Sequence, residues 1–272
     1  MNLTFIGGGN MAQAMIGGLR ARPGRRQGKI VVVDPDPKAR AKVARLGATA
    51  LVGLNGLRGP LGDLVVLAVK PQAMQAACLS LARFLKDEPV LSIAAGMRLD
   101  ALRRWLDGHP RLIRCMPNTP ALVGAGVSGL YALPAVTAAQ RKLAAAVLGA
   151  VGTVVWVEDE ALLDPITAVS GSGPAYVFYF IEALRDAAVG MGLDARAANQ
   201  LAIETFLGAA QLARQSGDDV SLLRERVTSK GGTTEAALRV LGDEQLAERF
   251  RKAVEAARRR SMELGATLGK DA

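Results

Sequence analysis

A glycine-rich turn near the N-terminus constrains the fold of this chain more than any other feature. The apolar run Leu3 to Ile6 leads directly into Gly7-Gly8-Gly9-Asn10-Met11-Ala12, which matches the pattern G-x-G-x-x-A. In that pattern the first glycine permits a tight turn and the second lets a ligand approach the backbone, while a small third residue lets a helix pack on a strand. The chain is therefore expected to open with a strand, a turn and a helix of a parallel sheet.

Short apolar runs alternate with helical stretches through the first half of the sequence. The runs are continuous, as in strands buried on both faces. They are Leu3 to Ile6, Ile30 to Val33, Leu64 to Ala68, Val90 to Ile93, Leu112 to Arg114 and Thr153 to Val157. After Leu162 the clearest segments are helical, at 175–191, 195–215 and 246–268. We expect an α/β fold: a doubly wound (Rossmann-type) parallel sheet domain, 1–160, followed by an all-α domain, 161–272.

The glycine turn also predicts a dinucleotide site. A helix that starts at such a turn presents free N–H groups and the positive end of its dipole to a pyrophosphate. A purely structural turn is the alternative, although strand, helix and second strand follow in the order that the site requires. The residues expected to contact the cofactor here are Ile6, Gly7, Gly8, Gly9, Asn10, Met11 and Ala12.

The second predicted strand ends at Asp34, where dinucleotide folds place the group that binds the adenine ribose. An acid there accepts a hydrogen bond from the ribose of NAD and repels the 2′-phosphate of NADP. The residue therefore favours NADH, but Lys38 and Arg40 lie close enough in sequence to bind a phosphate, so either NADPH or NADH stays open. Asp34 could also be an N-cap, since a helix is expected over Pro37 to Leu46.

Composition excludes several other classes of function. The formal charge is +9, and much of it falls in Arg20 to Arg26 and in Arg249 to Arg260. The second segment has apolar residues spaced along one helix face, so its charges belong on the solvated side. Aromatic residues make up only 4% and do not alternate with basic ones, as single-strand binding requires. With one histidine, a metal site or a histidine-based triad is not expected. No nucleic acid and no membrane span is expected either.

Cysteine usage and the start of the sequence favour the cytoplasm. Cys78 and Cys115 are the only cysteines, and their spacing fits neither a CxxC motif nor a ligand set, so both are expected to be free thiols. No basic leader precedes the first apolar run. The alanine-rich helical half has few polar faces, so we expect one side of it to pack against another subunit. A self-contained bundle is the alternative.

Several stretches of the sequence resemble the pyrroline-5-carboxylate reductase family. They are Ala68 to Gln72, Arg114 to Pro120, Ala168 to Tyr176 and Val227 to Ala237. Together with the glycine turn they run from residue 5 to residue 237 in the order found in the family. The resemblance implies hydride transfer from NADPH or NADH to 1-pyrroline-5-carboxylate, giving L-proline in the last step of proline biosynthesis. It also implies a homodimer formed through the helical domain, and further assembly into a higher homo-oligomer.

The resemblance further assigns residues to the cofactor and substrate sites. Those expected to line the cofactor are Asn55, Ala68, Val69, Lys70, Pro71, Ile93, Ala94 and Ala95. Backbone N–H groups of Gly231, Gly232 and Thr233 are expected to bind the substrate carboxylate, and Ser229 and Thr234 to supply catalytic hydroxyls, with Thr234 at the ring nitrogen. From the residues alone, 228–235 is a hydroxyl-rich loop entering a helix, which suits a small carboxylate or an ordinary helix cap.

Two features leave alternatives open. Lys230 stands where the family commonly has proline, so it could strengthen carboxylate binding or simply be exposed. A hydroxyacid dehydrogenase would need a catalytic lysine on the first long helix of the helical domain, and none lies between Ser170 and Gln215. Another imine oxidoreductase also stays possible, whereas a non-catalytic dinucleotide-binding protein would not need the loop from Ser229 to Thr234.

Overall fold

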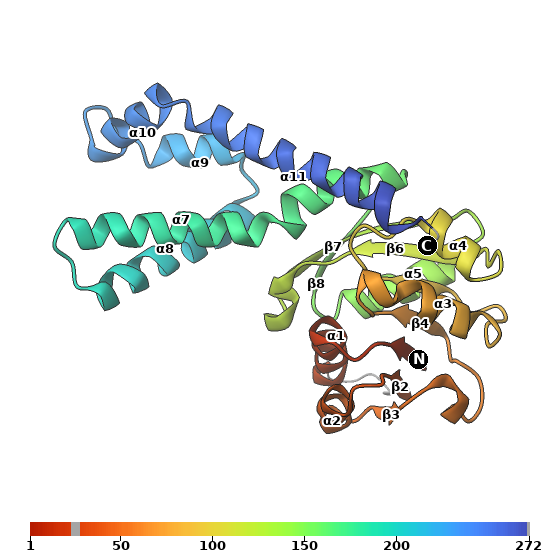
Figure 1. Ribbon diagram of the computed structural model, residues 1–272. Helices are drawn as coiled ribbons and strands as arrows, with labels where there is room; N and C mark the ends of the chain where they lie inside the picture. The colour runs from red at the N-terminus through yellow and green to blue at the C-terminus, as the bar shows by residue number, and fades with distance from the viewer. Residues whose placement is uncertain (23–27, 271–272) are drawn as a thin grey trace. The chain divides into compact units, whose positions relative to one another are not determined.

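A computed structural model describes residues 1–22 and 28–270, and part of the basic segment Arg20 to Arg26 lies outside this range (Figure 1). The chain divides into two compact units. Unit 1 contains Met1–Ser172 together with Ala257–Ala272, and unit 2 contains Gly173–Ala256. The division by packing therefore falls twelve residues after the expected boundary at 160/161 (172 − 160), and the end of the chain belongs to unit 1 rather than to the helical part.

A mainly parallel sheet of eight strands forms the centre of unit 1. In the order β3-β2-β1-β4-β5-β6-β7-β8 all neighbours are parallel except β6 and β7. The strands are β1 (Leu3–Ile6), β2 (Ile30–Val33), β3 (Thr49–Leu51), β4 (Leu64–Leu67), β5 (Val90–Ser92), β6 (Leu112–Met116), β7 (Gly126–Ala132) and β8 (Gly152–Trp156). The order reverses between β1 and β4, which is where open α/β sheets bind ligands.

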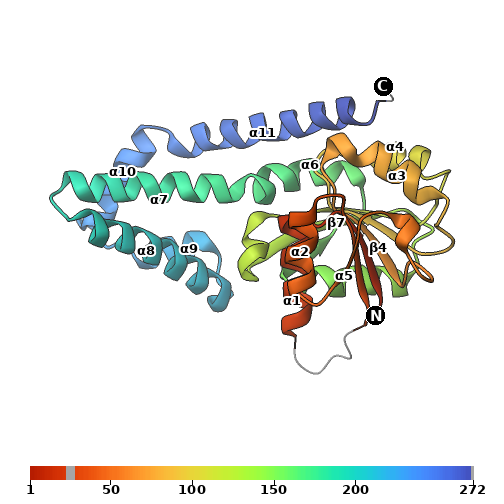
Figure 2. The same ribbon diagram turned by 60° about the horizontal axis from the view of Figure 1, so that its bottom comes forward.

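Helices cover both faces of this sheet (Figures 1 and 2). On one face lie α1 (Asn10–Ala21), α2 (Pro37–Arg45) and α5 (Ala138–Leu148), and on the other α3 (Met74–Ala82) and α4 (Leu99–Trp105). Side chains alternate between the two cores along β1, since Leu3 and Phe5 face α1 whereas Ile6 faces α3. The expected doubly wound sheet is confirmed.

Two strands and one helical distortion were absent from the sequence-based prediction. The missed strands are β3, which is only three residues long, and β7, which runs antiparallel to β6. After the short helix α6 (Leu163–Ile166), residues Thr167–Gly171 form a π-helical turn. Gly129 in β7 lies under α6, because a Cβ there would be 2.7 Å from the Ile166 Cδ1 atom. These contacts explain why residues 161–172 belong to unit 1.

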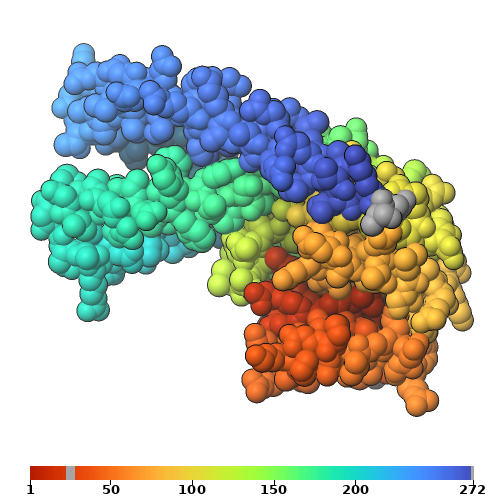
Figure 3. All heavy atoms as spheres, viewed as in Figure 1, coloured from red at the N-terminus to blue at the C-terminus, as the bar shows by residue number. Residues whose placement is uncertain are grey.

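The end of the last helix, α11 (Leu246–Leu268), packs beside α4 in unit 1. A Cβ on Gly96, just before α4, would lie 2.9 Å from Leu268 Cδ1, and Arg104 donates a hydrogen bond to the Gly269 carbonyl at 2.6 Å. The space-filling view shows the end of α11, in blue, against the orange and yellow surface over α3 and α4 (Figure 3). No helix in the described part of the chain is long and apolar enough to span a bilayer.

Unit 2 is entirely helical. It consists of α7 (Gly173–Gly190), α8 (Ala195–Ser216), α9 (Val220–Arg226), α10 (Thr233–Asp243) and the first part of α11. Asp194 caps α8 by accepting hydrogen bonds from the N–H groups of Arg196 and Ala197, which fixes the turn between α7 and α8. The Phe250 ring of α11 lies 5.5 Å from the Tyr176 ring and 5.7 Å from the Phe180 ring of α7.

Candidate functional site

The glycine turn lies at the carboxyl end of β1, as predicted. Gly7 has a φ of +101°, and a Cβ there would lie 2.7 Å from the carbonyl carbon and oxygen of Ala68. Its N–H donates to the Val33 carbonyl oxygen at 2.8 Å. Both the backbone angle and the contact with the chain after β4 therefore require glycine.

Gly9 leaves the start of α1 open. It is the N-cap residue of α1, no side chain caps this helix, and within the described chain nothing lies within 4 Å of a Cβ built on it. The uncapped N–H groups of the first turn can thus receive an anion that approaches the backbone closely. Asn10 is exposed and Met11 half-buried at this opening, whereas Ile6 and Ala12 are buried and offer only their backbone.

Asp34 connects the glycine turn to the loop after β2. Its Oδ2 accepts a hydrogen bond from the Gly8 N–H at 2.7 Å, and its Oδ1 accepts one from the Asp36 N–H at 2.8 Å. The N-cap of α2 is Asp36, which accepts from the Lys38 N–H at 2.9 Å, so the alternative that Asp34 is an N-cap is wrong. The Arg40 guanidinium is held nearby, donating to the carbonyl oxygens of Asp34 and Pro35 at 2.8 and 2.7 Å.

The remaining cofactor residues predicted from the family resemblance follow other strands of the same sheet. Because β1, β2, β3, β4 and β5 are parallel, their carboxyl ends share one edge. Residues Ala68 to Pro71 follow β4 and Ile93 to Ala95 follow β5, while Asn55 lies in a short 3-10 helix, Leu54–Gly56, after β3. Asn55, Lys70 and Ala95 are exposed, and Ala94 is buried. The structure thus brings the predicted cofactor residues to one edge of unit 1.

Asn118 is a buried polar residue at this edge to which sequence reasoning gave no role. It follows β6 and is only 9% exposed. Its Oδ1 accepts a hydrogen bond from the Val127 N–H at 2.8 Å, and its Nδ2 donates to the Ser170 carbonyl at 3.1 Å. Asn118 therefore holds the π-helical turn against the chain after β6. The sequence feature that could have pointed to Asn118 is an amide side chain after a buried strand, within the motif Arg114 to Pro120.

The predicted substrate loop lies in unit 2, between α9 and α10. Gly231 has a φ of +74°, which favours glycine, and its N–H donates to the Glu235 carboxylate at 2.7 Å. The Gly232 N–H donates to the Ser229 carbonyl oxygen at 3.0 Å, and Gly232 is the N-cap of α10, which no side chain caps. Two of the three N–H groups expected to bind a carboxylate thus already have acceptors within the loop, while Thr233 opens the helix.

The side chains of this loop differ in exposure. Ser229, Lys230 and Thr233 are exposed, whereas Thr234 is half-buried in the first turn of α10. The Thr228 hydroxyl is used structurally, donating to the Arg224 carbonyl at 2.7 Å. The loop therefore offers the hydroxyl groups of Ser229 and Thr234 beside a helix N-terminus, in agreement with an anion-binding role.

Thiol and metal chemistry receive no support from the geometry. Both cysteines are buried and free. Burial raises the pKa of the Cys78 thiol to about 12 and also raises the pKa of the Cys115 thiol, so neither is a reactive thiolate. Among the described residues no group of three or more His, Cys, Asp or Glu side chains could hold a metal ion. That this protein uses no metal stays a prediction.

Family models match both units of this chain. Residues 160–264 match the model described as pyrroline-5-carboxylate reductase dimerisation. Residues 2–96 match the model described as NADP oxidoreductase, coenzyme F420-dependent. The first match contains the predicted substrate loop, and the second contains the glycine turn and the loops after β2, β3, β4 and β5.

Individual proteins are similar over almost the full length. A pyrroline-5-carboxylate reductase from Pseudomonas aeruginosa is 48% identical over 272 residues, covering 98% of this chain and 98% of the relative. The solved structure of such a reductase from Coxiella burnetii gives a TM-score of 0.90 at 40% identity, covering 97% of this chain and 98% of that one. The Plasmodium falciparum pyrroline carboxylate reductase, solved with NADP bound, gives 0.84 at 28% identity, with coverages of 97% and 98%.

Proposed function

The chain belongs to the pyrroline-5-carboxylate reductase family, and from this premise we propose which of its residues carry the reaction. It is an NAD(P)H-dependent oxidoreductase that reduces the C=N bond of 1-pyrroline-5-carboxylate to L-proline, the last step of proline biosynthesis. Reduced nicotinamide supplies the hydride when it is bound.

The cofactor site of the proposal is the carboxyl edge of the sheet in unit 1. The observation that carries it is the open N-terminus of α1, where an added Cβ on Gly9 would meet no described atom within 4 Å. The turn from Ile6 to Ala12 would hold the pyrophosphate, Asp34 the adenine ribose, and Asn55, Ala68 to Pro71 and Ile93 to Ala95 the rest. A relative whose structure contains NADP supports a nicotinamide dinucleotide as the ligand.

The substrate site of the proposal is the loop Ser229 to Thr234. The start of α10 receives the substrate carboxylate, with the N–H groups of Gly231, Gly232 and Thr233 as donors. Since Glu235 already occupies the Gly231 N–H, the incoming carboxylate replaces one anion by another at this donor. The exposed Lys230 ammonium adds positive charge beside it without needing a fixed contact.

Few catalytic groups are needed once the two reactants are aligned. A protonated imine is already electrophilic, so orientation and exclusion of water supply most of the rate, in favourable cases roughly 7–11 kcal/mol. Thr234 orients the ring nitrogen through a hydrogen bond and helps to retain its proton, and the Ser229 hydroxyl supports the same end of the substrate. This role fits the half-buried position of Thr234 in the first turn of α10.

A second copy of this chain is the proposed partner of the helical unit. In residues 173–256, all of which the structure describes, only Ala188, Ala198 and Ala202 are buried. An open, mainly apolar groove of about 610 Å³ lies in this unit, lined in part by Phe180, Leu241 and Phe250. So little buried surface is too small a core for an independent helical unit. Dimerisation through unit 2 would supply the missing core, and further assembly would follow.

The cytoplasm is the proposed compartment. Support comes from the two cysteines, which are buried, unpaired and remote from each other in sequence. Proteins of oxidising compartments use such residues as disulfides far more often than proteins of the reducing cytoplasm.

Replacing Thr234 tests the assignment of the substrate loop. Thr234→Ala should lower kcat with 1-pyrroline-5-carboxylate about 10- to 100-fold, because a positioned hydrogen bond in the transition state is lost, while cofactor affinity stays unchanged. Oxidation of NADH and NADPH, followed by absorbance, measures this, and fluorescence of the bound reduced cofactor gives its dissociation constant. Thr205→Ala, on α8, removes a threonine hydroxyl outside the loop and serves as the control. Unchanged turnover would remove Thr234 from the mechanism.

A further inference from the structure

The loop between β5 and α4, residues Ile93 to Arg98, is held on its far side by the end of α11. Gly96 has a φ of +74°, and a Cβ there would lie 2.9 Å from Leu268 Cδ1 and 3.4 Å from Leu264 Cβ. A side chain is excluded by both the backbone angle and this contact. The first half of the loop, Ile93 to Ala95, is part of the proposed cofactor site.

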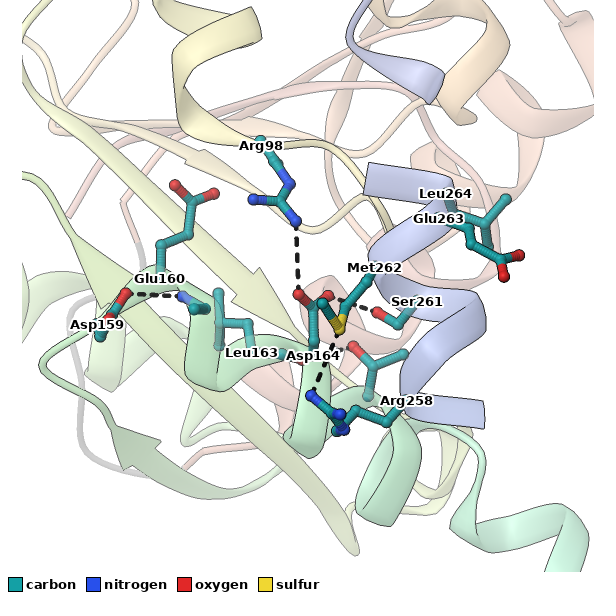
Figure 4. Close-up of polar contacts among 12 residues, drawn as sticks. Arg98, Asp159, Glu160, Leu163, Asp164, Arg258, Ser261, Met262, Glu263 and Leu264 are labelled. Atoms are coloured by element: carbon teal, nitrogen blue, oxygen red, sulfur yellow. Dashed lines mark hydrogen bonds and ion pairs between the residues drawn. The ribbon is translucent and has the colours of Figure 1, made fainter. Parts of the chain in front are cut away.

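Arg98, at the end of this loop, crosses the backbone of α11. A Cβ on Gly265 would lie only 2.7 Å from the Arg98 Nε atom, so the guanidinium passes directly over this glycine. Beyond it, Arg98 forms an ion pair with Asp164, with 3.7 Å between the guanidinium nitrogen and Oδ2 (Figure 4). The Arg98 side chain is 38% exposed.

Asp164 is a buried carboxylate in α6 that contacts both Arg98 and Ser261. Only 4% of the residue is exposed, and its Oδ1 accepts a hydrogen bond at 2.7 Å from the Ser261 hydroxyl of α11, itself 4% exposed. Figure 4 shows the Ser261 and Arg98 groups directed at the Asp164 carboxylate from α11 and from the start of α4. A buried charge of this kind is kept only when its partners compensate the loss of solvent.

A second carboxylate, Glu160, lies one turn before Asp164 and holds Leu99, the residue that follows the loop. Glu160 Oε1 accepts hydrogen bonds from the Leu99 N–H at 2.9 Å and from the buried Arg114 guanidinium at 2.9 Å. Leu99 is the first residue of α4, and no side chain of its N-cap residue bonds to this helix start. Glu160 and Asp164 therefore fix two consecutive residues, at the point where the cofactor loop ends.

The same segment continues into the π-helical turn. Thr167, the first residue of that turn, comes three positions after Asp164, and Ser170 within it is bonded to Asn118 at the sheet edge. One short stretch of chain thus connects the loop after β5 to the loop after β6. Such π-turns are frequent at functional sites.

We propose that Asp164 is a positioning residue for the reductase reaction: through Arg98 it fixes the loop Ile93 to Ala95 in the conformation that binds the reduced cofactor. The inference rests on the proposed cofactor role of that loop. Without the carboxylate, the partly exposed Arg98 turns toward solvent, and the loop keeps only the contact of Gly96 with α11 and the bond of Glu160 to Leu99. Cofactor affinity then falls, whereas the groups that act on the imine, in the loop Ser229 to Thr234, keep their chemistry.

The test compares Asp164→Asn with wild type and with Asp159→Asn. The asparagine keeps the size of Asp164 and its bond to Ser261 but removes the charge that holds Arg98. Kd and KM for NADH and NADPH should rise about 5- to 20-fold, with kcat and the KM for 1-pyrroline-5-carboxylate changed less than about twofold. Asp159 is an exposed neighbour whose carboxylate accepts a hydrogen bond from the local Ala161 N–H at 2.9 Å, so Asp159→Asn should bind cofactor like wild type.

A double-mutant cycle separates positioning from a general loss of stability. Arg98→Met removes the same ion pair by replacing its partly exposed partner. The double variant Asp164→Asn/Arg98→Met should bind the cofactor no more weakly than whichever single variant has the higher cofactor Kd. Arg98→Lys should recover part of the affinity. Additive losses, or a lowered Tm in Asp164→Asn with unchanged cofactor Kd, would overturn the proposal. Absence of turnover and of cofactor binding in the wild type would instead sink the proposed cofactor site itself.

Discussion

At the scale of single residues, Asp34 has a structural role and is also the group proposed to bind the adenine ribose. One carboxylate oxygen holds the Gly8 N–H and the other holds the Asp36 N–H, so the side chain fixes the glycine turn before any cofactor is present. The same negative charge disfavours a 2′-phosphate. Arg40, bound to two carbonyl oxygens beside it, is the cation that would receive such a phosphate once the carboxylate is removed.

Asp34→Ser should shift the cofactor preference toward NADPH. Repulsion of the 2′-phosphate is lost and Arg40 remains, so the ratio of kcat/KM for NADPH to that for NADH should rise about 10-fold or more. Because the bond to Gly8 weakens as well, affinity for NADH should fall in absolute terms. Steady-state kinetics with both cofactors at matched concentrations measure the ratio. An unchanged ratio would mean that Asp34 serves only to hold the turn.

His109 gives the stability of unit 1 a pH dependence. The side chain is 7% exposed, and its Nε2 is bonded to the Glu88 carbonyl oxygen at 2.9 Å. Burial, the largest cause, lowers the pKa of His109 from its ordinary value of 6.5. Just below pH 6.5 the unfolded chain therefore binds more protons than the folded one, and the free energy of unfolding decreases as pH falls through this window.

Replacing His109 by glutamine should flatten this dependence. The amide can still donate to the Glu88 carbonyl but does not titrate, so up to about 1.4 kcal/mol per pH unit of slope should disappear just below pH 6.5. Urea unfolding of wild type and variant across this range measures the slopes. The Asp87 pKa is lowered from 3.8 by its hydrogen bond to Arg111, so Asp87 titrates below the window. Equal slopes in both proteins would contradict the assignment.

At the scale of elements, the glycine turn has a packed end at Gly7 and an open end at Gly9, where the pyrophosphate is proposed to bind. Gly7 meets the backbone after β4, whereas Gly9 faces open space. The sequence pattern predicted the turn, the strand before it and the helix after it, since a βαβ unit depends on local spacing. The structure adds that a Cβ would overlap backbone atoms at Gly7, would lie 3.2 Å from the Val32 side chain at Gly8, and would meet no described atom within 4 Å at Gly9.

Alanine at Gly7 should therefore lower stability, whereas alanine at Gly9 should weaken cofactor binding. Gly7→Ala should lower the free energy of unfolding by about 2–4 kcal/mol, from backbone strain and overlap with Ala68. Gly9→Ala should unfold like wild type but bind NAD(P)H at least about 10-fold more weakly, because its methyl group fills the space proposed for the pyrophosphate. Urea unfolding and cofactor fluorescence measured on both variants decide this. Equal destabilisation by both would refute the distinction.

The elements that could not be predicted depend on distant contacts. β1 and β2 were predicted with their observed bounds, since continuous apolar runs are typical of central parallel strands. β7 was missed because it contains Gly126 and Gly129, and glycine is not typical of strands. Both glycines are small because Ala121 and Ile166, which lie outside the strand, pack against them in the folded chain. Likewise Asn118 and Ser170 are 52 residues apart, and only the folded chain shows that they are bonded. The positions of Asn55 and Thr234 relative to a ligand stay predictions.

At the scale of the whole molecule, the two units differ in how completely their own residues form a core. Unit 1 buries two continuous clusters, one on each face of the sheet. Unit 2 buries three alanines among residues 173–256 and leaves many large apolar side chains exposed, including Phe178 at 65% and Tyr179 at 68%. A helix whose aromatic face is exposed to this extent is expected to be covered in the working assembly.

Introducing a charge on that face should therefore dissociate the assembly and unfold unit 2 selectively. Phe178→Glu buries a carboxylate in the proposed dimer contact, which should raise the dissociation constant about 100-fold or more, so that the chain becomes monomeric at micromolar concentration. Leu79→Glu, at a position 59% exposed on α3 of unit 1, is the matched control and should remain assembled. Sedimentation velocity measures assembly, and amide hydrogen exchange should show loss of protection confined to residues 173–256. An assembled Phe178→Glu protein would place the interface on another surface, and a monomer with full protection would show that unit 2 is stable alone.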